Sequence, residues 1–472
     1  MKAPLTHGAY SSRSVAANAQ RCINLFTEAN PEDSAFPVTH YPAPGLRKLG
    51  AAPNNQGYRC LYRTKSTGEL FAVCGNAVYQ ISSTWVFTQL GTMASSTGIV
   101  SMADNGFEVL IVDGTTAGYT IDLVSKTFTV ITDPNFYGGT RVDVSDTYFI
   151  TNRPGTNNWY ISLTNESVWN ALDIASKTSL PDPLQTTFCI NDNVVLVGTR
   201  STEVWYNTGA ADFTYQKVTG VLIEQGTVAP YSLAKYESTA FWLSQNEQGQ
   251  AIVLAMGGFT VQRVSNHAIE DAFRAYGTIS DAVGFCYQIA GHAFYQLTFP
   301  SADKTWVYDA AEKEWHERCS MDSNGSHHRH AAQVCAFAFG LNVCGDWQNG
   351  NLYALDLATY TDNGSPILYL RSWPLIENED KRMTFRTFIA DMEAGNALGT
   401  AKPMVSLRWS DDRGASFSDP IQMPLGQSGQ YDTTLQWWGL GVGRFRVFEL
   451  SWSEPVKTAL LGAFVDVVPH KS

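Results

Sequence analysis

The segment Leu70-Phe71-Ala72-Val73-Cys74-Gly75-Asn76-Ala77-Val78-Tyr79-Gln80-Ile81 decides the fold of this chain. Two apolar runs, each of strand length, flank a Gly-Asn pair, which is a strong signal for a two-residue β-hairpin. A related pattern returns far downstream, where the apolar run 341–344 leads through a polar turn into the run 352–356. The sequence therefore predicts the same strand-turn-strand unit at both ends of a long region.

Similar units recur between these two hairpins at a nearly constant interval. The strand centres that we identify are Tyr79, Tyr119, Tyr160, Trp205, Val261, Tyr308 and Tyr353. Their mean spacing is about 46 residues, which is the size of one propeller blade. A sheet of this size cannot bury both of its faces alone, so the repeats pack face to face around an axis until the ring closes. We therefore predict a β-propeller with seven blades.

The composition and the placement of Pro-rich and polar segments predict an all-β chain in three parts. Aromatic residues make up 12% of the 472 residues, charged residues only 16%, and 38 residues are Gly, which is typical of strands and turns. Residues 1–56 are rich in Pro and predict an extended N-terminal arm; residues 57–374 are the predicted propeller. Alternating strands after the polar segment 375–385 predict a β-sandwich over residues 375–472. We expect that a chain lacking residues 1–50 still folds its propeller.

One helix interrupts the predicted strands, at residues 266–274, with Asn266 as its N-cap. The eight cysteines include no C-x-x-C pair, and most lie in apolar strand-like runs, so we expect buried, reduced thiols. The first residues lack the apolar core of a signal peptide, and no apolar run is long enough to cross a membrane. We expect a protein that is made and folded in a cytoplasm.

The clearest local motif is the segment 410–417, which matches the Asp-box pattern of sialidase propellers. Its defining residues are Ser410, Asp412, Gly414 and Phe417. In such a box the Asp accepts backbone N–H groups, the Gly supplies a positive φ, and the aromatic ring packs beneath the turn. The box occurs once and outside the predicted propeller, so we interpret it as a structural turn.

The other chemical signals are weak. The cluster His327-His328-Arg329-His330 follows Gly and Ser, which favours a solvated loop over a metal site. The chain has no G-x-x-x-x-G-K-[ST], G-x-S-x-G or H-E-x-x-H motif, so we predict no enzyme activity, no metal and no cofactor. A sialidase-like site would need three clustered arginines, and the sequence leaves these candidates open: Arg59, Arg141, Arg200, Arg263, Arg274 and Arg318.

Charge is distributed unevenly along the chain. The formal net charge is −12, which argues against a nucleic-acid coat, because phosphate neutralisation needs an excess of Lys and Arg. Residues 1–65 nevertheless hold eight Lys and Arg against three Asp and Glu. This asymmetry is compatible with a basic arm that binds an acidic partner, and equally with an arm that is merely solvated.

Across most of its length the chain resembles the packaged-DNA stabilisation proteins of short-tailed phages, also called tail hub or head-closure proteins. The resemblance rests on the order and spacing of short phrases rather than on a catalytic motif. These phrases are Cys22-Ile23-Asn24-Leu25-Phe26, Pro44-Gly45-Leu46-Arg47, residues 201–210, Trp306-Val307-Tyr308-Asp309-Ala310 and Cys344-Gly345-Asp346. A sandwich after the propeller and a chain of this length also resemble that family.

The resemblance implies a structural protein of the virion tail, assembled in the host cytoplasm. It implies a homohexameric ring beneath the portal and its adaptor ring, which retains packaged DNA without sequence recognition and anchors the tail needle and tailspikes. On this view the residues expected to contact the adaptor are Arg13, Arg21, Arg47 and Lys48. Two alternatives stay open: a carbohydrate-binding or sialidase-like propeller, for which exposed Trp residues at a pocket mouth are needed, and a host-derived regulatory propeller.

Overall fold

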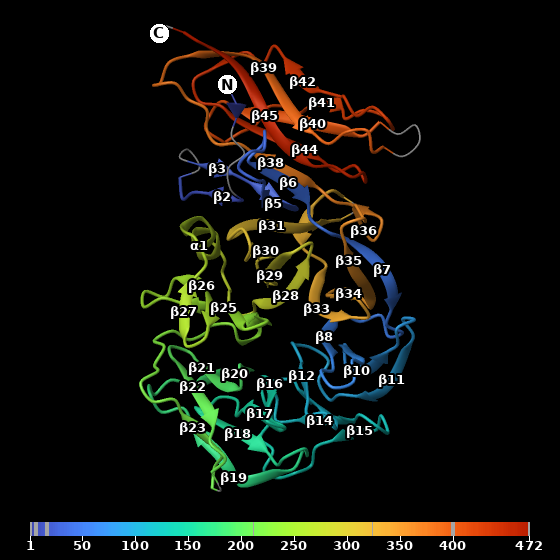
Figure 1. The fold of residues 1–472 in the computed structure, drawn as a ribbon, viewed down its shortest axis with the longest axis vertical. Helices are drawn as coiled ribbons and strands as arrows, with labels where there is room; N and C mark the ends of the chain where they lie inside the picture. The colour runs from blue at the N-terminus through green and yellow to red at the C-terminus, as the bar shows by residue number, and fades with distance from the viewer. Residues whose placement is uncertain are drawn as a thin grey trace.

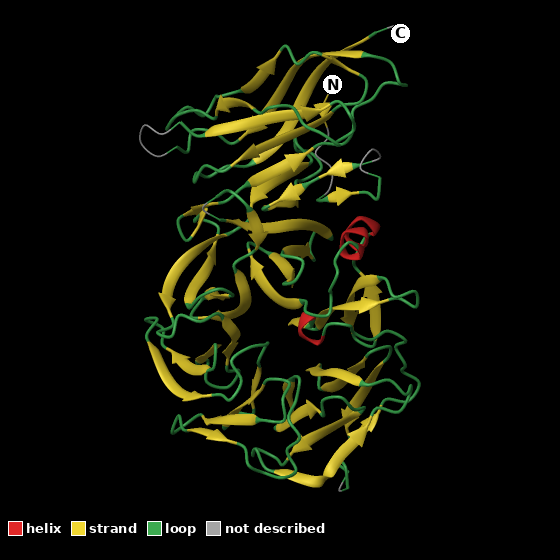
Figure 2. Cartoon of the chain, turned by 180° about the vertical axis from the view of Figure 1, so that it is seen from behind, coloured by secondary structure: helices red, strands yellow, loops and turns green. Residues whose placement is uncertain are grey.

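The computed structural model describes residues 2–3, 8–14, 18–210, 212–322, 324–397 and 402–470. These residues form an elongated body with a ring of sheets at one end and a sandwich at the other, and both ends of the chain lie at the sandwich end (Figure 1). Apart from the helices α1 (His267–Arg274) and η1 (Pro230–Ser232), the regular structure of the described residues is β-strand (Figure 2). The predicted all-β fold of propeller and sandwich is confirmed.

The first five blades are four-stranded antiparallel sheets whose strands follow one another in sequence. Blade 1 contains β8 (Tyr58–Arg63), β9 (Leu70–Cys74), β10 (Ala77–Ile81) and β11 (Phe87–Thr92), and blade 2 contains β12 (Ser101–Asp104), β13 (Glu108–Val112), β14 (Gly118–Asp122) and β15 (Phe128–Val130). Blade 3 contains β16 (Val142–Ser145), β17 (Tyr148–Asn152), β18 (Asn158–Ser162) and β19 (Trp169–Ser176). Blade 4 contains β20 (Leu184–Ile190), β21 (Asn193–Gly198), β22 (Thr202–Asn207) and β23 (Tyr215–Lys217), and blade 5 contains β24 (Ala234–Tyr236), β25 (Thr239–Gln245), β26 (Ala251–Gly257) and β27 (Thr260–Arg263).

The last two blades take part in larger sheets. Blade 6 contains β28 (Val283–Ile289), β29 (His292–Phe299), β30 (Lys304–Asp309) and β31 (Glu314–Met321). Blade 7 contains β33 (Ala332–Ala338), β34 (Leu341–Asp346) and β35 (Asn351–Asp356), with β7 (Gly45–Ala51) as its fourth strand. Within the described residues the ring therefore has seven blades, as the sequence predicts.

The predicted strand centres fall at equivalent places in six blades. Tyr79, Tyr119, Tyr160, Trp205, Tyr308 and Tyr353 all lie in the third strand of their blade. Val261 lies instead in β27, the fourth strand of blade 5; the third strand, β26, holds no aromatic residue that marks it in the sequence. The hydroxyl groups of several of these Tyr residues bind backbone, as Tyr119 does when it accepts from Ala94 N–H at 2.8 Å. The interval between the predicted strand centres is thus the interval between the third strands of successive blades.

The N-terminal segment closes the propeller ring. β7 pairs antiparallel with β35, so that Leu46 lies opposite Leu355. On its other side β7 pairs in parallel with the short strand β36 (Thr361–Asp362), which pairs in turn with β37 (Ser365–Pro366). A chain lacking residues 1–50 lacks most of the outer strand of blade 7, so the structure argues against the expectation that such a chain keeps a folded propeller, which stays a prediction.

The same segment also joins the propeller to the sandwich. The strand β4 (Cys22–Ile23) lies between β31 of blade 6 and β38 (Tyr369–Ser372), and the sheet continues through β44 (Val447–Trp452) and β40 (Met404–Ser410) to β41 (Ile421–Pro424). Blade 6 and one sandwich sheet are thus a single hydrogen-bonded sheet. The domain boundaries at residues 56 and 374 stay predictions. Strands formed by residues 1–56 lie in both the propeller and the sandwich.

The second sandwich sheet runs in the order β42 (Leu435–Trp438), β39 (Met383–Met392), β45 (Leu460–Pro469), β6 (Val38–Pro42) and β5 (Leu25–Ala29). The short strands β1 (Lys2–Ala3) and β43 (Val442–Gly443) pair with β45 and β39. Aromatic rings fill the space between the two sheets; Phe388 packs against Phe448 and Trp437 with ring centroids 4.7 and 6.0 Å apart. This core is separate from the apolar layers between the blades.

The predicted helix is confirmed at the junction between blades 5 and 6. The Asn266 side chain accepts a hydrogen bond from Ile269 N–H at 3.0 Å, which caps α1. Ile269 and Phe273 are buried among residues of both blades. The arm hairpin of β2 (Tyr10–Ser11) and β3 (Ala19–Gln20) lies next to this helix (Figure 1).

Candidate functional site: the central channel and the basic residues of the arm

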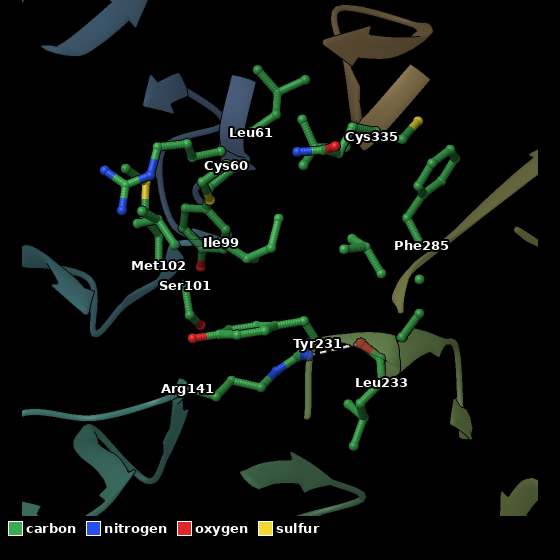
Figure 3. A pocket seen from close by; sticks show the side chains of 18 of the residues that line it. Cys60, Leu61, Ile99, Ser101, Met102, Arg141, Tyr231, Leu233, Phe285 and Cys335 are labelled. Atoms are coloured by element: carbon green, nitrogen blue, oxygen red, sulfur yellow. Dashed lines mark hydrogen bonds between the residues drawn. The ribbon is translucent and has the colours of Figure 1, made fainter. Parts of the chain in front are cut away.

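A polar cavity occupies the axis of the propeller. It has a volume of about 270 Å³ and is lined by residues from the innermost strands of several blades, including β8, β12, β24, β28 and β33. A second cavity of about 560 Å³ shares Arg59, Tyr231 and Gln333 with the first and extends toward Trp347. Figure 3 shows Arg141, Tyr231, Ser101 and Cys60 converging on the first cavity. Such a channel is where propellers commonly offer a ligand site.

Arg59 lines this channel, and its guanidinium is fully hydrogen-bonded. Its guanidinium donates to the carbonyl groups of Gly98 (2.6 Å), Gly75 (3.0 Å), Ser95 (2.8 Å) and Thr97 (2.6 Å), and to the Ser95 hydroxyl. Burial lowers its pKa, and the nearby Asp113, whose carboxylate accepts from Ser95, acts in the opposite direction. Arg59 therefore holds two loops together and has no donor left for a ligand.

Asp143 neutralises two lysines at the same wall. Its carboxylate accepts from Lys235, from the Cys189 N–H at 2.9 Å, and lies 3.8 Å from the Lys65 ammonium. Burial by itself raises the pKa of Asp143, but the two lysines and the backbone N–H outweigh burial, and the pKa falls to about 2. Asp143 is therefore a charged structural anchor between blades 3 and 5.

Two of the channel thiols, those of Cys60 and Cys286, are neutral. Burial raises the pKa of Cys60 to about 12 and also raises the pKa of Cys286. Burial also raises the pKa of the Tyr231 hydroxyl to about 12. Since the thiolate is the nucleophilic form of Cys, the Cys60 and Cys286 thiols are inert at neutral pH. The lining residues of the channel cavity that the structure describes include no carboxylate, so they offer no acid–base pair for glycoside hydrolysis.

The structure divides the predicted adaptor-binding residues into two pairs. Arg13 and Arg21 border one cavity of about 380 Å³ beside α1. The Arg13 guanidinium lies 3.5 Å from Asp271, and that of Arg21 lies 3.6 Å from the buried Glu449. These two arginines therefore also serve contacts within the chain.

The second pair, Arg47 and Lys48, lies on the outer strand of blade 7. Arg47 donates to Asp356 at 3.0 Å and remains half exposed, and Lys48 is exposed and its ammonium makes no hydrogen bond or ion pair with the described residues. This pair is more accessible to a partner. Whether any of the four residues contacts an adaptor stays a prediction.

The predicted Asp-box turn joins β40 to β41 in the sandwich. The Asp412 carboxylate accepts from Ser416 N–H at 2.8 Å and from the Ser416 and Ser410 hydroxyl groups at 2.5 and 2.6 Å. Gly414 has a φ of 96°. The Arg408 guanidinium stacks 4.6 Å from the Phe417 ring. The hydrogen bonds of Asp412 lie within this hairpin, whereas Asp411 accepts from Arg446 at 2.7 Å and Arg413 stacks 3.8 Å from the Phe445 ring, outside it.

The histidine cluster is not a loop, contrary to the sequence interpretation. His327–Arg329 form the short strand β32, which pairs with the end of β31, because Asp322 accepts from Ser326 N–H at 2.7 Å and closes a tight turn between them. His328 is hydrogen-bonded through Nδ1 to Asp303 at 2.7 Å, which raises its pKa, and the Asp322 carboxylate 3.6 Å from Nε2 acts in the same direction. The described residues contain no group of His, Cys, Asp and Glu arranged to hold a metal ion.

The six candidate arginines do not form one site. Arg59 and Arg141 line the channel, Arg263 pairs with Glu270, and Arg274 pairs with Asp271. Sequence reasoning did not distinguish Arg141 from the others, because its role depends on where the innermost strands converge. Its place immediately before the first strand of blade 3 is the only signal that the sequence carries.

Family models cover nearly the whole sequence. The model described as "Bacteriophage P22 Gp10, beta-propeller" matches residues 1–360, and the model described as "Bacteriophage P22 Gp10, beta-sandwich" matches residues 369–468. No curated protein matches the chain. The two helices of the described residues are far shorter than a membrane-spanning helix.

Solved structures offer only distant likenesses. The RRP9 WD40 repeats align at a TM-score of 0.41 and 9% identity, over 67% of this chain and 99% of that chain. The WD40 propeller of Doa1 aligns at 0.40 and 10% identity, over 66% and 97%. At these scores the alignments carry no argument about function. Because the two family models together account for both the propeller and the sandwich, this chain belongs to the bacteriophage P22 Gp10 family of phage structural proteins.

Proposed function

We propose that the chain is a tail hub that closes the portal and adaptor channel after genome packaging, retains the packaged DNA, and anchors the tail needle and tailspikes as one subunit of a hexameric ring. The observation that carries this proposal is the family match, which spans the propeller and the sandwich. On this proposal the protein works in the virion tail, is assembled in the host cytoplasm, and is not an enzyme.

The junction between the two bodies supports a load-bearing role. Blade 6 continues into the sandwich through β4 and β38, so force is transmitted through backbone hydrogen bonds rather than through a flexible linker. Asn24 reinforces this seam: its side chain donates to the Cys319 and Leu368 carbonyl groups at 3.0 and 2.8 Å, and accepts from Cys319 N–H at 3.1 Å. A subunit that retains DNA under pressure needs such stiffness.

Electrostatics support passing contact with DNA. The net charge of −12 repels phosphate, so DNA is expected to move along the ring without binding strongly. The exposed pair Arg47 and Lys48 offers a local basic surface for an acidic adaptor. The carbohydrate-binding or sialidase-like alternative is not favoured, because the Asp-box turn lies in the sandwich and the candidate arginines fall in separate places, two at the channel and two beside α1.

Native mass spectrometry of the chain mixed with portal and adaptor assemblies tests the proposal. We expect a mass increment of six copies; an unchanged adaptor mass would overturn the hub role. The double variant Arg47→Glu/Lys48→Glu is expected to weaken joining, whereas Lys381→Glu/Arg382→Glu, an adjacent basic pair on the sandwich, serves as the matched control. Equal joining by both variants would overturn the Arg47 and Lys48 contact and leave the hub role standing.

A further inference from the structure

Arg141 carries a positive charge into the propeller channel without a carboxylate partner among the described residues. Its backbone is fixed at the start of blade 3, where its carbonyl accepts from the Thr151 hydroxyl at 2.9 Å. Its Nη1 donates to the Leu233 carbonyl of blade 5 at 2.7 Å, and this is the one side-chain hydrogen bond that it makes within the described chain (Figure 3). The remaining N–H groups of the guanidinium are available to a ligand.

The surroundings offset this positive charge only in part: Asp143 acts to raise the pKa of Arg141, but the two side chains form no ion pair within the described residues. The nearest acid, Asp143, is already bound by Lys235 and Lys65. The Cys60 and Cys286 thiols are neutral, and Asp113 is tied to Arg59 through Ser95. Arg141 is partly buried, and a guanidinium that is partly withdrawn from water is stabilised by an accompanying anion, just as buried arginines are normally paired. Burial lowers the pKa of Arg141, which expresses the same cost.

A second donor faces the same space. The Tyr231 hydroxyl lines the cavity and makes no hydrogen bond with the described residues, and its phenol stays protonated because burial raises its pKa to about 12. Figure 3 shows the Tyr231 ring beside the Arg141 side chain. In the same view the guanidinium lies toward Leu233 and the Tyr231 hydroxyl lies toward Ser101, so the two donors border the cavity at different points, and an oxyanion that spans them accepts from both.

From this geometry we propose that the propeller channel binds a phosphate-sized oxyanion between Arg141 and Tyr231. The cavity of about 270 Å³ accommodates such an ion, and the adjoining cavity of about 560 Å³ provides its entry route. The bound ion neutralises Arg141 and links blades 3 and 5 across the channel. The same chemistry fits either free inorganic phosphate or the phosphate group of a mononucleotide.

Isothermal titration calorimetry of the full chain tests the site, with inorganic phosphate and AMP as separate probes at constant ionic strength in chloride. We expect saturable binding of phosphate and a rise in Tm of about 2–6 °C at saturation. Arg141→Gln should weaken binding about tenfold or more, and Tyr231→Phe several-fold, as expected for the loss of hydrogen bonds to a charged group. Arg200→Gln, which removes an exposed arginine outside the cavity, should bind as the unmodified chain does.

The two probes identify the source of the anion. Binding of phosphate alone assigns the free ion as the ligand, and competition between AMP and phosphate assigns a phosphate monoester. Failure of both probes to bind would overturn the proposal, as would equal affinity of the Arg141→Gln and Arg200→Gln proteins. If Arg141→Gln does not fold, the nearly isosteric Tyr231→Phe variant decides the question, and an unchanged affinity for phosphate would overturn the site.

Discussion

Leu46 of β7 lies directly opposite Leu355 of β35. The next residue on each strand, Arg47 and Asp356, form an ion pair although 309 positions separate them in the sequence. Leu46 is buried among side chains of blades 6 and 7. Gly45, at the start of the same strand, leaves no room for a side chain, because a Cβ there would lie 2.2 Å from the Thr359 carbonyl oxygen. The ring is thus closed by a strand from the N-terminal segment, so propeller and arm fold together.

Removal of residues 1–50 should therefore unfold the propeller rather than merely detach the arm. The truncated chain loses β4, β5 and β6 and most of β7, which exposes the edge of β35 and the apolar face of blade 7. We expect aggregation on size-exclusion chromatography and loss of a cooperative thermal transition. A chain lacking only residues 1–7 keeps β7 and should remain monodisperse. A soluble, cooperatively melting protein without residues 1–50 would contradict this account of ring closure.

Asn24 should be the most sensitive residue of the seam between propeller and sandwich. It is buried, has a φ of 53°, and makes four hydrogen bonds through its side chain, one of them to the Cys319 sulfur. Asn24→Ala loses these bonds and places Ala in the left-handed region, at a cost of about 3–4 kcal/mol. Scanning calorimetry should show a clear fall in Tm.

Asn363→Ala is the matched control for the backbone contribution. Asn363 has a φ of 51° but is exposed and makes no side-chain hydrogen bond with the described residues. We expect it to cost about 1 kcal/mol, the penalty for the backbone conformation alone. Equal losses of Tm in the two variants would show that the hydrogen bonds of Asn24 contribute nothing to the seam.

The sequence predicts the seven blades of the ring but not the strand that closes it, for a physical reason. Each hairpin carries its own local signals, such as Gly75-Asn76, so the period can be read blade by blade. The pairing of Leu46 with Leu355 has no local signal, because β7 is an outer strand whose partner is set by tertiary packing. The same reason explains why Arg141 is indistinguishable from surface arginines in the sequence, whereas the Asp-box turn is recognisable from its own eight residues.

The buried ion pair of Lys177 and Asp182 should be essential for the contact between blades 3 and 4. The Lys177 ammonium is fully buried and donates to Asp182 and to the Ser201 hydroxyl. Lys177→Met leaves a buried carboxylate without its counter-ion, which costs about 3–5 kcal/mol. The partly exposed pair of Lys126 and Glu69 provides the control, and Lys126→Met should cost less than about 1 kcal/mol. Calorimetric Tm values that fall equally in both variants would contradict this difference.

The Asp-box turn should make the sandwich sensitive to acid in a defined pH range. Hydrogen bonds from Ser410 and Ser416 lower the pKa of Asp412 from 3.8 to about 2. Because the native pKa lies below the unfolded value, the stabilisation is complete above about pH 4 and is lost as the pH falls through about 2. Asp412→Asn should therefore lower the Tm at neutral pH, and its Tm should approach that of the unmodified chain as the pH falls from 4 to 2. Asp419→Asn, whose carboxylate makes no hydrogen bond with the described residues, should follow the unmodified chain throughout. An NMR titration that places the pKa of Asp412 at or above 3.8 would show that the hydrogen bonds of the turn do not hold the charge.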